Sequence, residues 1–98
     1  MINSKQRGYL RALANTMDAI LQVGKGGIND NLIKHVNEAL EARELIKITV
    51  LNNSAESPSD ICGQIAVATN AETIQVIGKK IVLYRESVEN KTIELPKD

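Results

Sequence analysis

Apolar residues recur with the period of a helix in three stretches of the chain. In order along the sequence, the stripes are Leu10, Leu13, Ala14 and Met17; Leu32, Ile33, Val36, Ala39 and Leu40; and Ile61, Ile65 and Ala68. Residues that favour helix N-caps precede them, namely Ser4, then Asn29 or Asp30, then Ser57. Pro58 suits a first helical position, and Asn70 can end the third helix. The pattern predicts three helices, the second running to about Arg43.

Four other stretches have the composition and period of strands. Residues 19–23 form a short apolar run ended by Gly24, and residues 45–51 alternate between apolar and polar side chains. Residues 73–77 and 80–84 are separated by Gly78-Lys79, which suits a type II′ hairpin turn. The element order α-β-α-β-α-β-β predicts an α/β (α+β) fold with a single mixed four-stranded sheet packed with three helices.

The length and composition indicate one domain with an aliphatic core. The chain has 98 residues, no Phe, no Trp and two Tyr. Tyr9 and Tyr84 are too few for the RNA-binding modules that stack bases on several aromatic rings. From residue 86 on, charged residues outnumber core residues. We therefore expect a domain over residues 1–85 and a polar, loosely held tail over residues 86–98.

The charges cancel overall but are unevenly distributed. The chain has 12 Lys and Arg against 12 Asp and Glu, with a basic stretch over residues 1–35 and an acidic one over residues 36–78. The single Cys62 excludes an internal disulfide, and with His35 it is too little for a structural zinc site. We interpret Cys62 as a small core residue and His35 as packing at the edge of a buried helix face. The lack of a signal peptide and of a membrane-length apolar run predicts a cytoplasmic protein.

The stretch Gly24-Lys25-Gly26-Gly27 is the most informative part of the sequence. It lies between a buried strand and a helix N-terminus, where free N–H groups and the helix dipole favour a phosphate. The dinucleotide fingerprint fails at Asn29, and no Gly-Lys pair is followed by the Ser or Thr of a Walker motif. What remains is G-x-x-G, with which KH domains clamp a nucleic-acid backbone. A plain strand-to-helix turn accounts for the pattern equally well.

Basic residues supply a second candidate set. Lys5, Arg7 and Arg11 lie on the first predicted helix, which leads into the strand that ends at the glycine loop. Its basic face could therefore flank the loop, and the two together could follow several phosphates; a solvated face is the alternative interpretation. The secondary candidates for RNA contact are Lys34, Lys79, Lys80 and Arg85.

The acidic residues indicate no catalytic site. Glu38, Glu41 and Glu44 have the spacing of a solvated acidic helix face. No nucleophile, base and orienting group occur together, so we predict a protein that is not an enzyme and needs no cofactor or metal ion.

Four blocks of sequence, spread over residues 3–85, stand in a characteristic order. They are Lys5-Gln6-Arg7-x-Tyr9-Leu10-Arg11-x-Leu13-Ala14, Gln22-Val23-Gly24-Lys25-Gly26-Gly27, Ala39-Leu40-Glu41-Ala42-x-Glu44-Leu45-Ile46-Lys47 and Gln75-Val76-Ile77-Gly78-Lys79-x-x-Val82-Leu83-Tyr84-Arg85. Together the blocks resemble the CRM domain (chloroplast RNA splicing and ribosome maturation), and the chain is similar to its free-standing bacterial YhbY-like members.

The resemblance implies an RNA-binding domain with a fold similar to the C-terminal domain of a translation initiation factor. It also implies an association with precursors of the large ribosomal subunit. The family's G-x-x-G falls on Gly24 and Gly27, with Lys25 and Gly26 between them. Its basic first helix falls on Lys5, Arg7 and Arg11, and its closing Leu-Tyr-Arg on Leu83, Tyr84 and Arg85. Gly8 departs from the pattern, which has a long polar or basic residue there.

These observations lead to one main prediction and two alternatives. We predict a monomeric, non-catalytic protein that grips the backbone of ribosomal RNA and acts in assembly of the large subunit, with no membrane partner. The first alternative is an adaptor that docks on a ribosomal protein through the final hairpin or the acidic second helix. The second is a binder of small phosphoryl ligands at the glycine loop.

Overall fold

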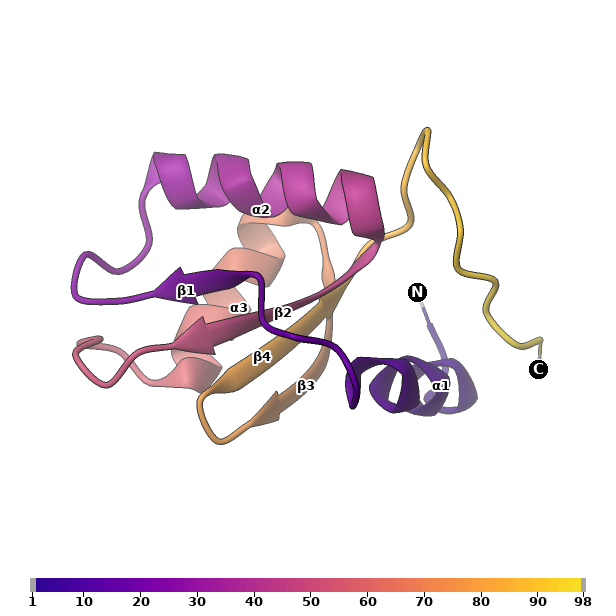
Figure 1. Ribbon diagram of the computed structural model, residues 1–98, viewed down its shortest axis with the longest axis horizontal. Helices are drawn as coiled ribbons and strands as arrows, with labels where there is room; N and C mark the ends of the chain where they lie inside the picture. The colour runs from indigo at the N-terminus through magenta and orange to yellow at the C-terminus, as the bar shows by residue number, and fades with distance from the viewer. Residues whose placement is uncertain (1, 98) are drawn as a thin grey trace.

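The computed structural model describes residues 2–97 and contains seven regular elements (Figure 1). They are α1 (Ser4–Ala14), β1 (Leu21–Val23), α2 (Asp30–Arg43), β2 (Leu45–Val50), α3 (Pro58–Thr69), β3 (Glu72–Ile77) and β4 (Lys80–Tyr84). The strand order across the sheet is β1-β2-β4-β3. The β1–β2 pair is parallel, and the other two pairs are antiparallel. The predicted element order and the mixed four-stranded sheet are confirmed.

Helices pack on both sides of the sheet. α2 and α3 lie on one side, over a core that includes Val36, Leu40, Ile48, Ile61 and Ile81. α1 lies on the other side, over a smaller core formed by Leu10, Ala14, Leu45, Ile74, Val82 and Tyr84, with Ile93 and Leu95 of the C-terminal segment packed against it. The alternation of strand side chains therefore supplies two cores.

Local side-chain hydrogen bonds set the helix ends. The cap of α1 is Asn3 rather than Ser4: its Oδ1 accepts from the Gln6 N–H at 2.8 Å, and Gln6 Oε1 accepts from the Asn3 N–H at 3.0 Å. Asn29 caps α2 and Ser57 caps α3, as predicted. Asn70 ends α3 in the left-handed conformation, with φ of 57°.

Some predicted core positions face solvent instead. Leu13 is 37% exposed. The buried residues of the short helix α1 are Leu10 and Ala14. Ala68 is exposed, and Thr69 takes its place in the core, where its Oγ1 donates to the Ile65 carbonyl at 2.8 Å. Of the two interpretations of single residues, the one for His35 was wrong and the one for Cys62 is confirmed. His35 is exposed rather than packed at a buried edge, whereas Cys62 is a core residue, as expected.

The C-terminal segment is tied to the domain, contrary to the expectation of a loosely held tail. Glu44, at the end of α2, has a φ of 67° and is completely buried. Its carboxylate accepts from the backbone N–H groups of Ser87 at 2.9 Å and of Thr92 and Ile93 at 2.8 Å. Burial works to raise the pKa of Glu44, but these hydrogen bonds outweigh it and the pKa lies below its usual value.

Glu41, one turn earlier, holds the start of the same segment. Its carboxylate accepts from the Ser87 hydroxyl at 2.7 Å and from the backbone N–H groups of Val88 and Glu89, each at 3.0 Å. The Ser87 hydroxyl and these two N–H groups lower its pKa to about 2. The prediction of a solvated acidic face was therefore wrong for Glu41 and Glu44. A segment without regular structure needs acceptors for its N–H groups, and these carboxylates supply them. The boundary at residue 85 stays a prediction.

Candidate nucleic-acid interface

The glycine loop is a tight turn whose tip is open to solvent. The Gly27 N–H donates to the Gly24 carbonyl at 2.9 Å, and Gly27 has a φ of +64°, where glycine is favoured. A Cβ at Gly24 would lie 3.3 Å from Leu51 Cδ1, so packing restricts that position. Gly26 has an ordinary φ and nothing within 4 Å of an added Cβ. The turn therefore explains Gly24 and Gly27 but does not require a glycine at Gly26.

The loop and the first turn of α2 offer backbone donors. Among residues 2–97, the N–H groups of Lys25 and Gly26 have no hydrogen-bond acceptor, and both residues are exposed. The Asn29 side chain accepts from the Leu32 N–H at 2.8 Å, which satisfies one donor of the first turn and leaves others free. Asp30 adds a negative charge to this turn. An anion would therefore be held mainly by the exposed loop, with Lys25 beside it.

Three connections meet at this end of the sheet, as Figure 1 shows. The loop that follows β2 packs against Gly24, and the Val50 N–H donates to the carbonyl of Lys79 in the β3–β4 turn at 2.7 Å. Lys79 Nζ contacts the Asn52 side chain, and Lys80 Nζ donates to Thr49 Oγ1 at 2.7 Å. In that turn φ is +57° at Gly78 but not positive at Lys79, as a type II′ turn requires. The structure thus brings Lys79 and Lys80 to the end of the sheet that carries Lys25.

The first helix does not flank the glycine loop, which corrects the sequence-based expectation. α1 packs on Leu45 and Tyr84, whereas the loop follows Val23, which pairs with Val50 at the other end of β2. Five residue steps of strand separate Leu45 from Val50, about 17 Å. Figure 1 accordingly places α1 and the loop toward opposite ends of the molecule. The reason is that β1 runs parallel to β2 and carries the chain away from α1.

The basic side chains of α1 differ in how far they are engaged within the protein. Arg7 donates to the Thr73 carbonyl and lies 3.8 Å from the Glu72 carboxylate, so it connects α1 to the edge strand β3. Lys5 and Arg11 are exposed, and their side chains have no hydrogen bond or ion pair within residues 2–97. These two remain free to meet an external anion.

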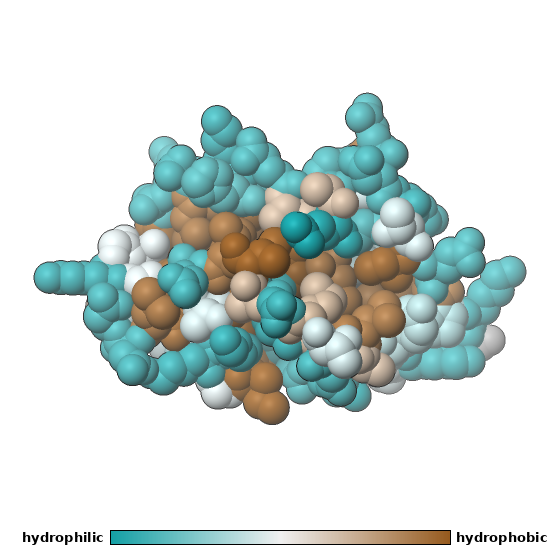
Figure 2. Space-filling model, in the orientation of Figure 1, coloured by the Kyte–Doolittle hydropathy of each residue, from teal (hydrophilic) through white to brown (hydrophobic). Residues whose placement is uncertain are grey.

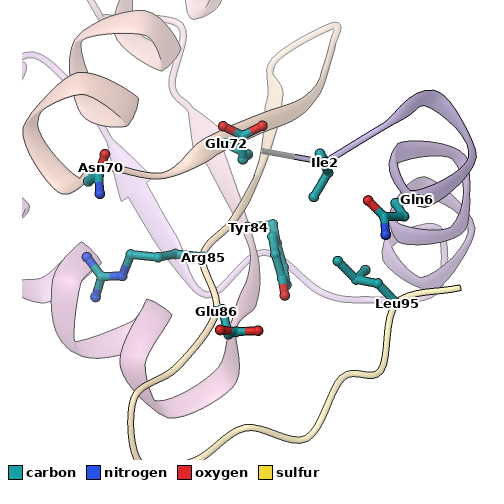
Figure 3. Close-up of a pocket in the computed structure, with 8 residues that line it drawn as sticks. All are labelled: Ile2, Gln6, Asn70, Glu72, Tyr84, Arg85, Glu86 and Leu95. Carbon is teal, nitrogen blue, oxygen red and sulfur yellow. The ribbon is translucent and has the colours of Figure 1, made fainter. Parts of the chain in front are cut away.

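Two secondary candidates also differ. Lys34 is exposed on α2, shortly after the glycine loop. The Arg85 guanidinium donates to Asn37 Oδ1 and to the Thr69 carbonyl at 2.7 Å each, and to the Asn37 carbonyl at 3.1 Å. In Figure 3 it points away from the ring of Tyr84. Arg85 thus joins α2 to the end of α3, and its hydrogen bonds hold it there rather than at the glycine loop.

Lys47 is a candidate that the sequence reasoning missed. It is half-buried on β2, and its side chain has no hydrogen bond or ion pair within the described part of the chain. Its pairing with Val82 places it on the α1 side of the sheet. The sequence contained one indication of this candidate, since Lys47 is the one charged residue in the alternating stretch 45–51.

Away from the glycine loop, the described residues line cavities but form no metal-ligating cluster. A cavity of about 440 Å³ lies between α1, the C-terminal segment and the ends of β3 and β4 (Figure 3). Its lining includes the acids Glu72 and Glu86, and burial together with Glu44 and Glu86 raises the pKa of Tyr84. Within residues 2–97, no three His, Cys, Asp or Glu residues gather as they would around a metal ion. No helix of this range has the length and apolar character needed to cross a membrane.

Comparison with known proteins settles the family. The family model of the CRS1 / YhbY (CRM) domain matches residues 2–85. The chain belongs to the CRM family. The resemblance carried by the four sequence blocks is therefore confirmed, and the sheet and loops described above are those of a CRM domain.

Two relatives and one solved structure match this CRM protein over nearly their whole length. "Probable RNA-binding protein YqeI" of Bacillus subtilis is 51% identical over 96 residues, which are 98% of this chain and 100% of the relative. An "RNA-binding protein" of Haemophilus influenzae is 33% identical over 96 residues, which are 98% and 96% of the two chains. The solution structure of the hypothetical protein SAV1595 from Staphylococcus aureus has 52% sequence identity and a TM-score of 0.82, and the match covers 98% and 100% of the two chains.

Proposed function

We propose that this CRM protein is a non-catalytic RNA-binding protein that holds the RNA backbone at its glycine loop. The observation that carries the proposal is the open position of Gly26, where neither packing nor φ requires a glycine. A glycine there lets a ligand approach the backbone closely. The names of the relatives from Bacillus subtilis and Haemophilus influenzae support RNA as that ligand.

The contacts follow from the chemistry of the loop. The free N–H groups of Lys25 and Gly26 donate to phosphate oxygens, and the Lys25 ammonium adds a mobile positive charge. Lys79 and Lys80 extend the contact from the neighbouring turn, and the exposed side chains of α1 extend it at a distance. Tyr84 is buried, so the surface lacks a row of aromatic rings for stacking bases. Recognition therefore depends on the backbone and shape of the RNA rather than on a base code.

We further propose that the RNA is ribosomal RNA of a large-subunit precursor and that the protein acts as a cytoplasmic monomer in assembly of that subunit. The family resemblance supports this assignment. The adaptor alternative loses its main support, because Glu41 and Glu44 of the acidic helix are occupied by the protein's own C-terminal segment.

The proposal is tested by comparing Gly26→Asp with Gly63→Asp. Both positions are exposed and leave open space around an added Cβ, but Gly63 lies on α3. We expect Gly26→Asp to weaken binding to large-subunit RNA fragments at least tenfold while its melting temperature stays near wild type. Gly63→Asp should bind as wild type does. Gly27 is unsuitable for this test, because its positive φ would strain any side chain.

Salt dependence provides an independent measurement of the same contact. If about three to five phosphates are neutralised, log K should fall with log salt at a slope of roughly −2 to −4. A flat response, or binding of Gly26→Asp at wild-type affinity, would contradict the proposal. Saturable binding of a mononucleotide at the loop, without RNA binding, would favour the small-ligand alternative.

A further inference from the structure

The helix α1 covers only part of its side of the sheet. The strand register places Lys47, Thr49 and Lys80 on this side, because Lys47 pairs with Val82 of the α1 core and Thr49 pairs with Lys80. Gln22 of the edge strand β1 pairs with Thr49 and joins the group. Gln22 and Lys80 are exposed, and the other two are half-buried. We call Gln22, Lys47, Thr49 and Lys80 the sheet platform.

The sheet platform is polar and positively charged. Thr49 Oγ1 accepts from Lys80 Nζ at 2.7 Å, which holds this ammonium group over the sheet. The Lys47 ammonium has no hydrogen bond or ion pair in the described chain. Among the strand positions on this side, all of which the structure describes, the one acid is Glu72, and it is paired with Arg7. At these strand positions an anionic partner would therefore meet two lysines and no unpaired carboxylate.

The sheet platform lies between the two separated parts of the proposed RNA site. Thr49 immediately precedes Val50, which pairs with Val23 before the glycine loop. Lys47 lies two residues closer to α1 along the same strand. Figure 1 shows this stretch of sheet between the loop end and α1. In the same view, Figure 2 shows hydrophilic residues around most of the edge of the molecule and hydrophobic residues over its middle. The sheet platform therefore lies on the side of the sheet that joins the glycine-loop end to α1.

We propose that the sheet platform binds RNA together with the glycine loop and α1, and that this RNA is double-helical. The inference rests on the proposed function and names the substrate class. An A-form helix presents phosphates and 2′-hydroxyls across a wide, shallow minor groove, which suits a flat polar surface. Lys47 and Lys80 meet phosphates, while the Gln22 and Thr49 side chains offer hydrogen bonds to 2′-hydroxyls.

The aromatic residues argue against a single strand as the ligand. Proteins that bind single strands without sequence preference stack bases on aromatic side chains. Within residues 2–97, Tyr84 is buried, and Tyr9, which is 40% exposed, belongs to α1. The sheet platform therefore has no ring on which an unpaired base could stack.

The test compares the double variant Lys47→Gln/Lys80→Gln with Lys91→Gln/Lys97→Gln. Both pairs remove two positive charges, but Lys91 and Lys97 lie in the C-terminal segment. The probes are an RNA hairpin with a duplex stem, an unstructured RNA strand and a DNA duplex of the stem sequence. The wild type should bind the hairpin at least tenfold tighter than either other probe. The platform variant should bind the hairpin about tenfold more weakly, with a salt slope shallower by about 2. The control should stay within twofold, and melting temperatures should show that both variants fold.

The outcomes separate this inference from the proposed function. If the platform variant binds the hairpin as tightly as wild type while Gly26→Asp does not bind, the sheet platform is not part of the site and the proposed function stands. If the wild type prefers the unstructured strand, the assignment of double-helical RNA is overturned. If the wild type binds none of the nucleic acids, or takes up a protein partner in their place, the proposed function fails together with the inference.

Discussion

The hydrogen bonds of Glu44 lead to a quantitative prediction about stability. Its buried carboxylate accepts three backbone N–H groups of the C-terminal segment at 2.8–2.9 Å. A hydrogen bond to a charged group contributes about 1.5–3 kcal/mol. In Glu44→Ala, part of this loss is recovered, because the freed N–H groups of the segment can bond to water. We therefore expect the free energy of unfolding to fall by about 3–5 kcal/mol, out of the roughly 5–15 kcal/mol typical of a domain.

Urea denaturation followed by circular dichroism measures this loss, and amide hydrogen exchange locates it. The Thr92 and Ile93 amides should lose their protection in Glu44→Ala. Glu44→Gly serves as the internal comparison, because it removes the same carboxylate but relieves the positive φ at this position. Relief of this strain stabilises the folded protein by about 1–3 kcal/mol. The greater conformational freedom of glycine in the unfolded chain destabilises it by about 0.4–1 kcal/mol. The Glu44→Gly variant should thus be at least as stable as the Glu44→Ala variant. A loss below about 1 kcal/mol in Glu44→Ala, with unchanged exchange at Thr92 and Ile93, would refute the reasoning.

Two further predictions concern pH and Arg85. The folded-state pKa values of Glu41 and Glu44 are lowered, that of Glu41 from 4.5 to about 2, so their contribution to stability is complete above pH 4.5 and is lost as the pH falls toward 2. The urea midpoint should therefore fall over this interval, and less steeply in Glu44→Gln; equal slopes in the two proteins would contradict the assignment. Arg85→Gln leaves the Asn37 and Thr69 carbonyls without their donor and should lower the free energy of unfolding by about 1–3 kcal/mol. RNA affinity in a filter-binding assay should stay within twofold, and weaker RNA binding at unchanged stability would show that Arg85 contacts the RNA.

Local patterns were sufficient to predict the elements of the fold. The apolar stripe of α2, its cap Asn29 and the left-handed residue Asn70 each depend on a few neighbouring residues, so their roles can be read directly from the chain. The error at the start of α1 was one residue, because Asn3 and Ser4 are both good caps and the bond from Gln6 decides between them.

Long-range contacts were not predictable in this way. The partners of Glu44 lie 43 to 49 residues further along the chain, and no period or motif connects them. The same holds for Arg85, which is 48 residues from Asn37, and for the placement of α1 far from the glycine loop. The sequence identified the loop through its glycines. It did not show that the turn can form without a glycine at position 26, because that follows from the φ of Gly27 and from the packing of Leu51 against Gly24.

The attachment of the C-terminal segment has a consequence for truncation of the chain. The family match stops at residue 85, two residues before the first donor to Glu44. A chain cut at that boundary would leave the Glu44 carboxylate to water in place of the three backbone N–H groups that donate to it. The region that the family model matches is therefore shorter than the region joined by these hydrogen bonds, and residues 87–93 supply the donors to Glu41 and Glu44.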